Sequence, residues 1–440
     1  MSERSSEHFS AKNFVFLGRV CYTSAPCLNL THREKGWLQR VCGPLFLRPI
    51  LIVEVNIGME VLSPYKEATD VILEAGGEPL KLCYQCGLCT GICPWNLVRG
   101  FIVRRIMHEA QLGATDFGNE DVWTCVTCRA CVQRCPRGVE IIDVMRAIRR
   151  AVAGMGIGVV PDALRISAKN IGGVGNPLGE APEKRNDWAK DLEVKDFASG
   201  TEILYFPCCI PSYDPDVKTV ARSVATIFNK LKINYGIIGT EAKCCGESIR
   251  KAGYEDTFQS LAQNNINLFT SNGVKTVVVS SPHCYHTFKN EYPELGGKFE
   301  VIHITQYLAS LIDEGKLKLS KKINKKVIYS DPCYLGRHNN IYDEPRKVLE
   351  SIPGLELIEF PDARENGICC GGGGGRIWMD TPKGERFSDI RVEQAAKQGA
   401  DIIALACPYC FLNYRDSVLS MGKAETLQVK DIAELVAEAM

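Results

Sequence analysis

The stretch ICCGGGGGRIW at residues 368–378 places two adjacent cysteines in front of five consecutive glycines. A related stretch, KCCGES at residues 243–248, has the same pair of cysteines in front of a glycine. Both stretches belong to a longer repeat, because three pairs of cysteine motifs keep one offset of 124 to 126 residues. We therefore predict two copies of one unit, at residues 201–320 and 321–440. The other two motif pairs are EILYFPCC (202–209) with KVIYSDPC (326–333), and VVVSSPHC (277–284) with IALACPYC (403–410).

Each copy alternates short β-branched runs with helical patterns. EILYF (202–206) and DIIALA (401–406) are typical of buried strands, whereas VKTVARSVATIFNKLK (217–232) and RFSDIRVEQAAKQG (386–399) have the pattern of helices. Alternation of this kind predicts parallel α/β units. The cysteines follow the strands directly, so we expect them at the carboxyl edge of each sheet, where open α/β folds carry their sites.

The second copy contains five cysteines that we expect to converge. Zinc takes four ligands, so five thiolates suit a larger iron–sulfur cluster better. A phosphate-binding loop would need Gly-Lys-Ser/Thr, but Arg376 and Ile377 follow the glycines. A disulfide between adjacent cysteines is sterically awkward. The five predicted ligands are Cys333, Cys369, Cys370, Cys407 and Cys410.

The glycine run has a separate role in this prediction. Glycine gives up more conformational freedom than any other residue when its backbone is fixed, so five in a row need a structural reason. We expect Gly371, Gly372 and Gly373 to let the backbone approach a cluster and turn back, with amides able to donate hydrogen bonds to the cluster sulfides.

The first copy departs from the second at one position. Ser281 stands where the second copy has Cys407, which leaves four firm ligands for a cubane cluster, a modified cluster or zinc. His283 and His286 are nearby, and we expect them to hydrogen-bond to ligands rather than to bind metal. The four predicted ligands are Cys209, Cys244, Cys245 and Cys284.

The counterpart of Cys333 in the first copy is open at this point. The pattern after YFP favours Cys209, whereas the spacing between motifs fits Cys208 slightly better.

Two further cysteine runs precede the repeat. CYQCGLCTGICP (83–94) and CVTCRACVQRCP (125–136) both follow the spacing C-x2-C-x2-C-x3-C-P. This is the bacterial two-cluster ferredoxin spacing, in which the fourth cysteine of each run binds the cluster of the other run. Zinc sites pair C-x2-C motifs and fit two runs of four cysteines badly. We expect one [4Fe-4S] cubane on Cys83, Cys86, Cys89 and Cys135, and the other on Cys125, Cys128, Cys131 and Cys93.

The segments around these runs define the remaining domains. The spacer between the runs contains VRGFIVRRIMHEAQLG (98–113), an amphipathic helical pattern that favours a helical ferredoxin-like module over residues 59–153. Residues 154–200 are rich in Gly, Pro and charge, and we expect a linker that packs along a domain surface. Residues 1–58 lack sustained periodicity, whereas a helical pattern begins at Met59. We expect a poorly ordered extension or a gene-model artefact before it.

Composition restricts the possible functions. The 440-residue chain has 21 cysteines, a formal net charge of zero at pH 7 and 45% hydrophobic residues. Zero net charge gives no support for nucleic-acid binding. No run reaches the roughly 18–20 apolar residues of a membrane span. The charged N-terminus does not have the pattern of a secretory signal, so we expect a cytoplasmic protein whose cysteines bind metal rather than form disulfides.

The CCG repeats, fused behind a two-cluster module, resemble those of heterodisulfide reductase, in its D-type iron–sulfur component. The wider family of CCG-domain iron–sulfur oxidoreductases includes subunits of glycolate and lactate oxidising systems. CCGESIRKAGYED (244–256), SPHCYHTFKNEYPELGG (281–297) and CCGGGGGRIWMD (369–380) look most like the iron–sulfur part of oxidoreductases that pass electrons from electron-transfer flavoprotein to quinone. The resemblance covers about residues 65–440. It implies an α+β multidomain fold, with a helical two-cluster ferredoxin-like module followed by a duplicated α/β CCG domain.

The resemblance also implies cofactors. In this family an intact CCG repeat binds a noncubane [4Fe-4S] cluster, which would fall on the five cysteines of the second copy. In heterodisulfide reductase such clusters cleave disulfides, so the same five cysteines would be the catalytic residues. Ser281 departs from the pattern of two complete sites.

The leading hypothesis is an electron-transfer subunit of a multi-subunit anaerobic oxidoreductase, relaying single electrons between the cubanes and the CCG cluster. The chain lacks a flavin or nicotinamide fingerprint, so a partner would supply the two-electron chemistry. We expect that partner to be a flavoprotein, a quinone-reactive membrane subunit or a larger soluble reductase complex. A position at the cytoplasmic membrane face is the alternative location. The alternative functions are a catalytic disulfide reductase and a metal-stabilised scaffold with zinc in the first copy.

Overall fold

The computed structural model describes residues 64–440. The predictions for residues 1–58 and for Met59 lie outside this part of the chain. Among the described residues, no helix combines the length and the apolar character needed to cross a bilayer.

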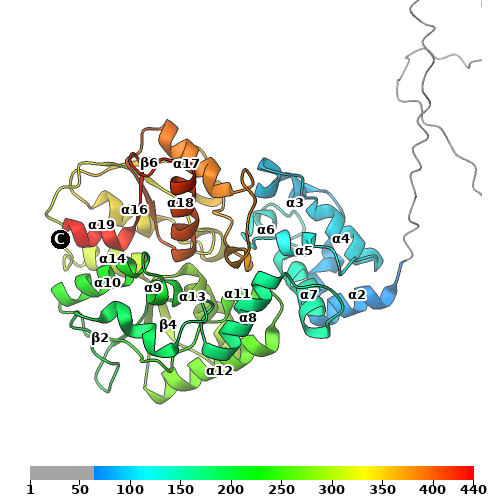
Figure 1. Cartoon of the computed structure of the whole chain (residues 1–440), viewed down its shortest axis with the longest axis horizontal. Coiled ribbons are helices and arrows are strands. Elements are labelled where there is room, and N and C mark those ends of the chain that lie inside the picture. The colour runs from blue at the N-terminus through cyan, green and yellow to red at the C-terminus, as the bar shows by residue number, and fades with distance from the viewer. Residues whose placement is uncertain (1–63) are drawn as a thin grey trace, which may run out of the picture. The chain divides into compact units, whose positions relative to one another are not determined.

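Two parallel sheets of four strands organise the second half of the chain (Figure 1). Their strand orders are equivalent, β2-β1-β3-β4 and β6-β5-β7-β8, and every pairing is parallel. The predicted duplication and the predicted parallel α/β units are therefore confirmed. The strands are β1 Ile203–Phe206, β2 Tyr235–Gly236, β3 Thr276–Val279, β4 Glu300–His303, β5 Lys326–Tyr329, β6 Glu356–Glu359, β7 Ile402–Leu405 and β8 Gln428–Asp431.

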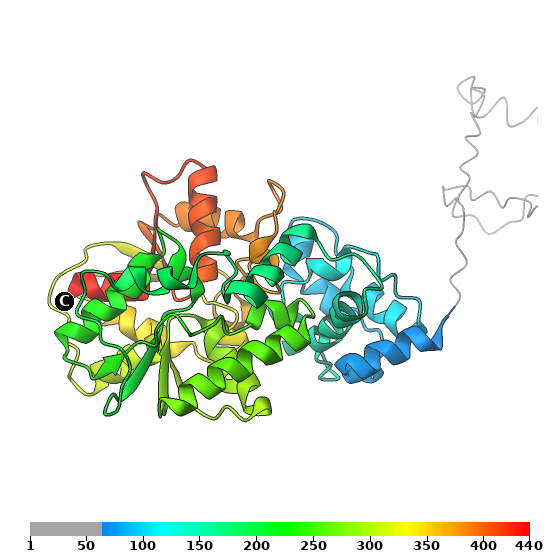
Figure 2. The ribbon, with the colours of Figure 1, turned by 60° about the horizontal axis from the view of Figure 1, so that its bottom comes forward.

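Helices connect the strands, and the turned view of Figure 2 shows them enclosing the sheets. The helices predicted within residues 217–232 and 386–399 are α10 and α17. The helices of the two copies are α9 Cys209–Tyr213, α10 Lys218–Lys230, α11 Glu247–Lys251, α12 Glu255–Ser271, α13 Pro282–His286, α14 Ile304–Asp313, α15 Gly336–Asn339, α16 Asp343–Glu350, α17 Phe387–Lys397, α18 Pro408–Ser420 and α19 Ile432–Ala439.

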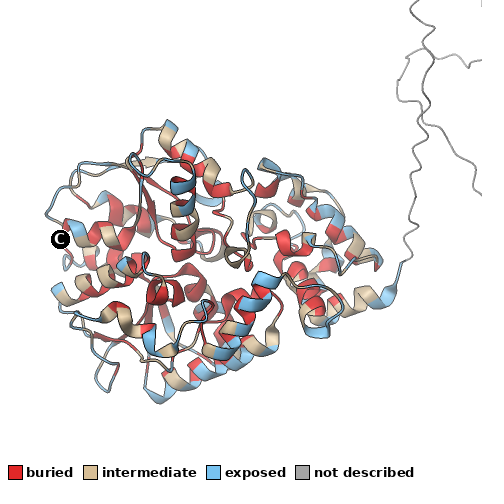
Figure 3. Ribbon diagram, in the orientation of Figure 1, coloured by how far each residue is buried: buried red, intermediate tan, exposed pale blue. Residues whose placement is uncertain are grey.

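The central strands are hydrophobic and covered on both faces. All four residues of β1 and of β7 are buried, as expected for parallel strands enclosed by helices. One continuous core joins the two copies, since Leu204 and Val278 of the first sheet belong to the same cluster as Val327 and Tyr329 of the second. Figure 3 shows this interior in red in both copies. The two copies therefore share one hydrophobic core and are not separate domains joined by a linker.

Residues 64–155 form a helical module around the ferredoxin-type runs (Figure 1). Each run turns sharply into a short helix at its third cysteine, and the residues before those helices, Gly87 and Arg129, have φ of 85° and 68°. The helix predicted within residues 98–113 is α4. The elements are α2 Lys66–Ile72, η2 Leu73–Gly77, η3 Glu78–Leu82, α3 Leu88–Gly91, η4 Pro94–Leu97, α4 Val103–Leu112, α5 Asp121–Thr124, α6 Ala130–Gln133 and α7 Ile141–Met155.

Residues 154–200 contain helix α8 (Asp162–Val174) and the 3-10 helix η5 (Pro182–Ala189). Arg185 and Trp188 of η5 are buried. Trp188 packs edge-on against Tyr205 of β1, with 5.8 Å between ring centroids. This segment therefore contributes side chains to the core of the first copy.

One buried guanidinium ties three parts of the chain together. Arg149 lies on α7 and is 0% exposed. It donates hydrogen bonds of 2.7 to 3.0 Å to the carbonyls of Val122 and Cys125 in the helical module, Lys251 in the first copy and Gly374 in the second. A single side chain thereby satisfies four backbone acceptors that burial would otherwise leave unpaired.

We expect Arg149→Met to lower the apparent melting temperature of the holoprotein by roughly 6 °C or more. It would leave four buried carbonyls without donors, at a cost of about 1–3 kcal/mol for each unsatisfied group. Differential scanning fluorimetry measures the shift. Arg105→Met is the matched control, because Arg105 makes a 2.8 Å ion pair with Asp121 on the surface. The control should shift by about 2 °C or less, and equal shifts in both variants would contradict the role assigned to Arg149.

Candidate iron–sulfur centres

The ferredoxin-type cysteines line two separate cavities. Each cavity combines three cysteines of one run with the fourth cysteine of the other, which is the crossed grouping that the spacing predicts. Cys86 at the first cavity is exposed, whereas Cys128 at the second is buried. The first set therefore reaches the surface, whereas the second has Cys128 buried and its other three thiols half-buried. The first set is Cys83, Cys86, Cys89 and Cys135, and the second is Cys93, Cys125, Cys128 and Cys131.

The five cysteines of the second copy meet at the carboxyl edge of its sheet. Cys333 follows β5, and its Sγ lies 3.8 Å from Sγ of Cys369. Sγ of Cys410 lies 3.3 Å from Sγ of Cys370. Cys407 follows β7 and contacts Cys410. All five thiols are buried, so the structure brings the predicted set together inside the fold.

Backbone amides point at the sulfurs of three sites. Gly371 N donates to Cys369 Sγ at 3.3 Å in the second copy, and Gly246 N donates to Cys244 Sγ at 3.5 Å in the first. In the helical module, Val139 N donates to Cys135 Sγ at 3.4 Å. Such N–H donors favour the thiolate, which is the form that binds iron.

The glycine run lies against the helical module. A Cβ on Gly373 would overlap with the carbonyl oxygen of Val126, and one on Gly374 would lie 2.5 Å from the carbonyl oxygen of Cys125. Gly374 also has φ of 62°, in the left-handed region. Glycine is therefore required here because two backbones touch. The glycine run therefore has two roles. Gly373 and Gly374 allow the two backbones to touch, and the amide of Gly371 donates to Cys369 Sγ.

The second cavity and the second-copy site touch each other. The thiol of Cys128 contacts the thiol of Cys369, and this contact, followed by burial, raises the pKa of Cys128 well above its ordinary value. Arg337 is buried between them and donates to the carbonyls of Cys128 at 2.7 Å and Gly367 at 2.6 Å. Its charge acts on Cys128, Cys333 and Cys369. A fixed cation thus faces both thiol sets at their point of contact.

The first copy also brings five thiols together. Sγ of Cys284 lies 3.4 Å from Sγ of Cys245, and Cys209 contacts Cys244. These two contacts repeat the thiol pairs of the second copy, and they make Cys209 the counterpart of Cys333. Cys208 contacts Cys284, so both candidates from the sequence face this site.

His283 lies between the two copies. Its ring stacks on Tyr334 with 4.0 Å between centroids and lies 4.4 Å from the ring of Tyr409. Glu247 Oε2 is 3.1 Å from His283 Nδ1. Burial lowers the pKa of His283, but Glu247 and a hydrogen bond with Cys407 outweigh burial and raise it to about 10. The imidazole is therefore a cation that faces a thiol of the second copy.

The thiol of Cys407 responds to this cation. Burial raises the pKa of Cys407, but hydrogen bonds with Cys410 and His283 outweigh burial and lower it to about 6. His286 lies farther out, where its Nδ1 is 3.0 Å from the Asn290 amide nitrogen. None of these contacts joins His283 or His286 to a thiol of the first copy.

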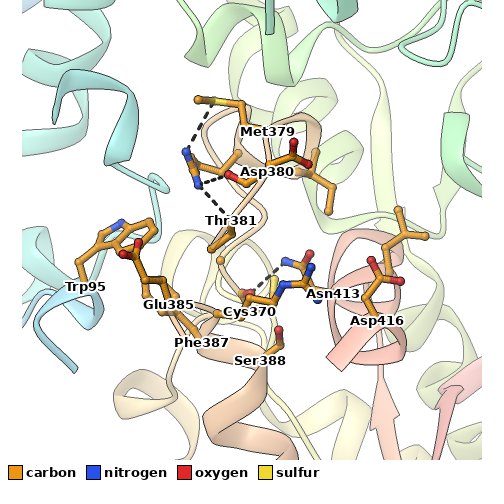
Figure 4. Close-up of a pocket in the computed structure, with 15 residues that line it drawn as sticks. Trp95, Cys370, Met379, Asp380, Thr381, Glu385, Phe387, Ser388, Asn413 and Asp416 are labelled. Carbon is orange, nitrogen blue, oxygen red and sulfur yellow. Dashed lines mark hydrogen bonds between the residues drawn. The ribbon is translucent and has the colours of Figure 1, made fainter. Parts of the chain in front are cut away.

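A pocket of about 200 Å³ opens beside the second-copy site (Figure 4). Cys370 lies at its base, and the Asn413 side-chain amide donates to the Cys370 carbonyl at 2.9 Å. Trp95 of the helical module forms one wall, and Phe387 and Asp416 come from α17 and α18. A small molecule or a partner side chain could therefore approach Cys370 from solvent.

The donor chemistry of the four sites fits iron–sulfur clusters. The converging groups are thiols, and amide or cationic donors surround them. In a four-iron cluster the thiolates bind different irons, so they surround a larger volume than the ligands of one ion. Within residues 64–440, no three His, Cys, Asp or Glu side chains gather as they would around a single metal ion.

Comparisons with known proteins identify both halves of the chain. The cysteine-rich domain CCG matches residues 203–289 and 327–415, and the 4Fe-4S dicluster domain matches residues 82–140. The HdrD-type chain of the dihydromethanophenazine:CoB–CoM heterodisulfide reductase from Methanosarcina barkeri is 33% identical over 392 residues, which cover 82% of this chain and 94% of that protein. The chain belongs to the family of CCG-domain iron–sulfur oxidoreductases that includes this reductase. The family, the dicluster domain and the duplicated CCG domain implied by the resemblance are thereby confirmed.

Two other members of the CCG family are longer than this chain. The EtfAB:quinone oxidoreductase of Syntrophomonas wolfei is 37% identical over 337 residues, covering 73% of this chain and 47% of that protein. "Probable iron-sulfur-binding oxidoreductase FadF" of Bacillus subtilis is 36% identical over 330 residues, again covering 73% of this chain and 47% of that protein. The chain thus spans about half the length of these two relatives.

Sequence reasoning found the thiols of this CCG family member but missed the groups between them. Glu247 and Arg337 carry no motif of their own, and Arg149 has the appearance of a solvated residue on an amphipathic helix. One usable signal was present: Glu247 follows the CCG of the first copy where the second copy has Gly372. An acidic residue replacing glycine beside buried thiols indicates a polar partner nearby.

We expect Gly373→Ala to weaken the contact between the glycine run and the helical module. Its Cβ would overlap with a backbone carbonyl, and neither backbone can move without disturbing a thiol site. The apparent melting temperature should fall by several degrees, and visible cluster absorbance should fade faster in a chelator. Gly173→Ala on α8 is the control, because its Cβ would meet open space, and its melting temperature should stay level or rise slightly. Indistinguishable behaviour of the two variants would contradict this assignment.

Proposed function

We propose that this chain is an electron-transfer subunit of a multi-subunit oxidoreductase, relaying single electrons between the ferredoxin-type module and the second CCG copy. The clusters, when bound, would supply the one-electron chemistry. The proposed ligands are the two crossed sets of the helical module (Cys83, Cys86, Cys89 and Cys135; Cys93, Cys125, Cys128 and Cys131) and the five thiols of the second copy (Cys333, Cys369, Cys370, Cys407 and Cys410).

The contact between Cys128 and Cys369 carries this proposal. It joins a ligand candidate of the inner ferredoxin-type set directly to one of the second copy. Sites joined through touching sulfurs need no intervening solvent. Arg337 fixes their separation, because it binds the carbonyls of Cys128 and Gly367 while its charge faces both thiol sets.

The outer set supports contact with a partner. Cys86 is exposed, and Leu82, Tyr84 and Leu88 around it are 45%, 59% and 52% exposed. Apolar side chains gathered beside a redox site favour a protein contact there. We propose a flavoprotein or a quinone-reactive subunit as the partner, in line with the EtfAB:quinone relative.

A second function is favoured by the pocket at Cys370. A disulfide that entered it would take up two electrons, delivered singly, and two protons to give two thiols. Arg376 and Arg386 line the pocket together with the carboxylates Asp380, Glu385 and Asp416, so its lining carries charges of both signs. The observation that separates the two functions is whether a disulfide changes the electron paramagnetic resonance signal of the second-copy site.

The test is iron and sulfide content of anaerobically purified protein, with Cys370→Ser beside it. We expect about twelve or more irons per chain, from two cubanes and a cluster of the second copy. Cys370→Ser should lose one distinct paramagnetic signal and keep the ferredoxin-type signals. In partly reduced wild type, a ferredoxin-type signal should be broadened by the neighbouring second-copy cluster. Loss of this broadening in Cys370→Ser, with the signal itself retained, would report the contact at Cys128.

About eight irons with identical spectra in the two proteins would contradict a cluster in the second copy. Zinc without excess iron would instead support the scaffold function. Val418→Ala serves as the control for packing damage near the site, since Val418 is buried on α18 eight residues after Cys410. Its iron content should equal that of the wild type.

A further inference from the structure

We propose that the first CCG copy holds an iron–sulfur cluster with five thiolates, and that Cys208 replaces the thiolate lost at Ser281. This inference rests on the proposed function, because it extends the chemistry of the second copy to the first. It changes the expectation from the sequence, in which Ser281 leaves the first site with four ligands and open to zinc.

The duplication identifies which positions correspond. The registers of β1 with β3 and of β5 with β7 superpose at the repeat offset. They pair Cys209 with Cys333 and Ser281 with Cys407. Cys208 then has no thiol counterpart, since Pro332 stands at its position in the second copy. The first copy has therefore lost one cysteine and gained another.

The gained cysteine makes the contact that the lost one would make. In the second copy Cys407 contacts Cys410. In the first copy Cys284 is the counterpart of Cys410, and it contacts Cys208. Because the other two thiol contacts are also repeated, the five sulfurs of the first copy have the same pattern of neighbours as those of the second.

The backbone at Cys208 is held in an unusual conformation to achieve this. Its φ is 81° and its ψ is 161°, a region that is essentially reserved for glycine. Cys208 is the only cysteine with positive φ among the described residues. The Ser212 amide and hydroxyl hold the turn by donating to the Cys208 carbonyl at 3.2 and 2.8 Å. Outliers of this kind gather at functional sites, where the surrounding structure holds them.

Two buried polar side chains of this region lack a hydrogen-bond partner in the described part of the chain. Ser281 is 0% exposed and its hydroxyl has no hydrogen-bond partner in the described part of the chain. Arg185 is 3% exposed, neither of its terminal nitrogens has a partner of ordinary geometry there, and its charge acts on Cys209 and Cys244. A buried cation without a carboxylate indicates an anionic group beside it. A cluster bound by thiolates is anionic, whereas five neutral thiols are not.

The test compares iron content and Mössbauer spectra of wild type, Cys208→Gly and Cys370→Ser, each purified anaerobically. Glycine adopts the backbone of residue 208 without strain, so Cys208→Gly removes the thiol and not the fold. We expect it to lose as much iron as Cys370→Ser loses, but from a different spectral component. Wild-type iron content in Cys208→Gly, or one zinc per chain with iron only in the other sites, would overturn the proposal.

A rescue experiment addresses the replacement itself. The double variant Cys208→Gly/Ser281→Cys puts the thiol back at the position used by the second copy. We expect it to regain the lost spectral component, and a folded double variant that does not regain it would overturn the exchange of Cys208 for Ser281. If the wild-type spectrum contains no component that Cys370→Ser removes, the proposed function fails. If Cys370→Ser removes a spectral component but Cys208→Gly removes none, the proposed function stands and this inference alone fails.

Discussion

The backbone contact between the glycine run and the second ferredoxin-type run is the constraint on which the rest of the structure depends. Gly373 and Gly374 lie so close to the carbonyls of Val126 and Cys125 that a methyl group would not fit. Arg149 binds carbonyls on both sides of this contact. The same approach brings Cys128 against Cys369. A loosening of one backbone contact would therefore separate two thiol sites as well as two domains.

Around this constraint the two copies have diverged while their fold stayed the same. Both sheets keep one strand order and one thiol pattern, but the first copy supplies Glu247 and His283 to the space between the copies. The second copy supplies Tyr334 and Tyr409, which stack on His283. The cation that lowers the pKa of Cys407 thus belongs to the first copy. Both copies therefore supply residues around His283, and the two thiol sites do not have independent surroundings.

The sequence predicted what repeats and spacing encode. A constant offset predicted the duplication, and the C-x2-C-x2-C-x3-C-P runs predicted the crossed grouping that the two cavities show. It could not predict contacts between segments far apart in the chain, such as Gly373 with Val126, because no local pattern records them. Arg149 has the local pattern of a solvated helix residue and is buried by tertiary packing. The choice between Cys208 and Cys209 depended on contacts between sulfurs and on strand register, which residue types do not reveal.

In the proposed relay, charge placement would give the two ends different affinities for an electron. Arg337 and protonated His283 face the second-copy thiols from buried positions, where their fields are weakly screened. The arginines that line the outer cavity, Arg104 and Arg137, are exposed, so solvent and salt screen them. Buried positive charge stabilises the more negative, reduced state and raises its potential. With clusters bound as proposed, an added electron would therefore rest more favourably at the second copy, beside the pocket at Cys370, than at the exposed end near Cys86. In the proposed relay, this gradient would favour electron entry at the apolar surface around Cys86 and exit at the pocket.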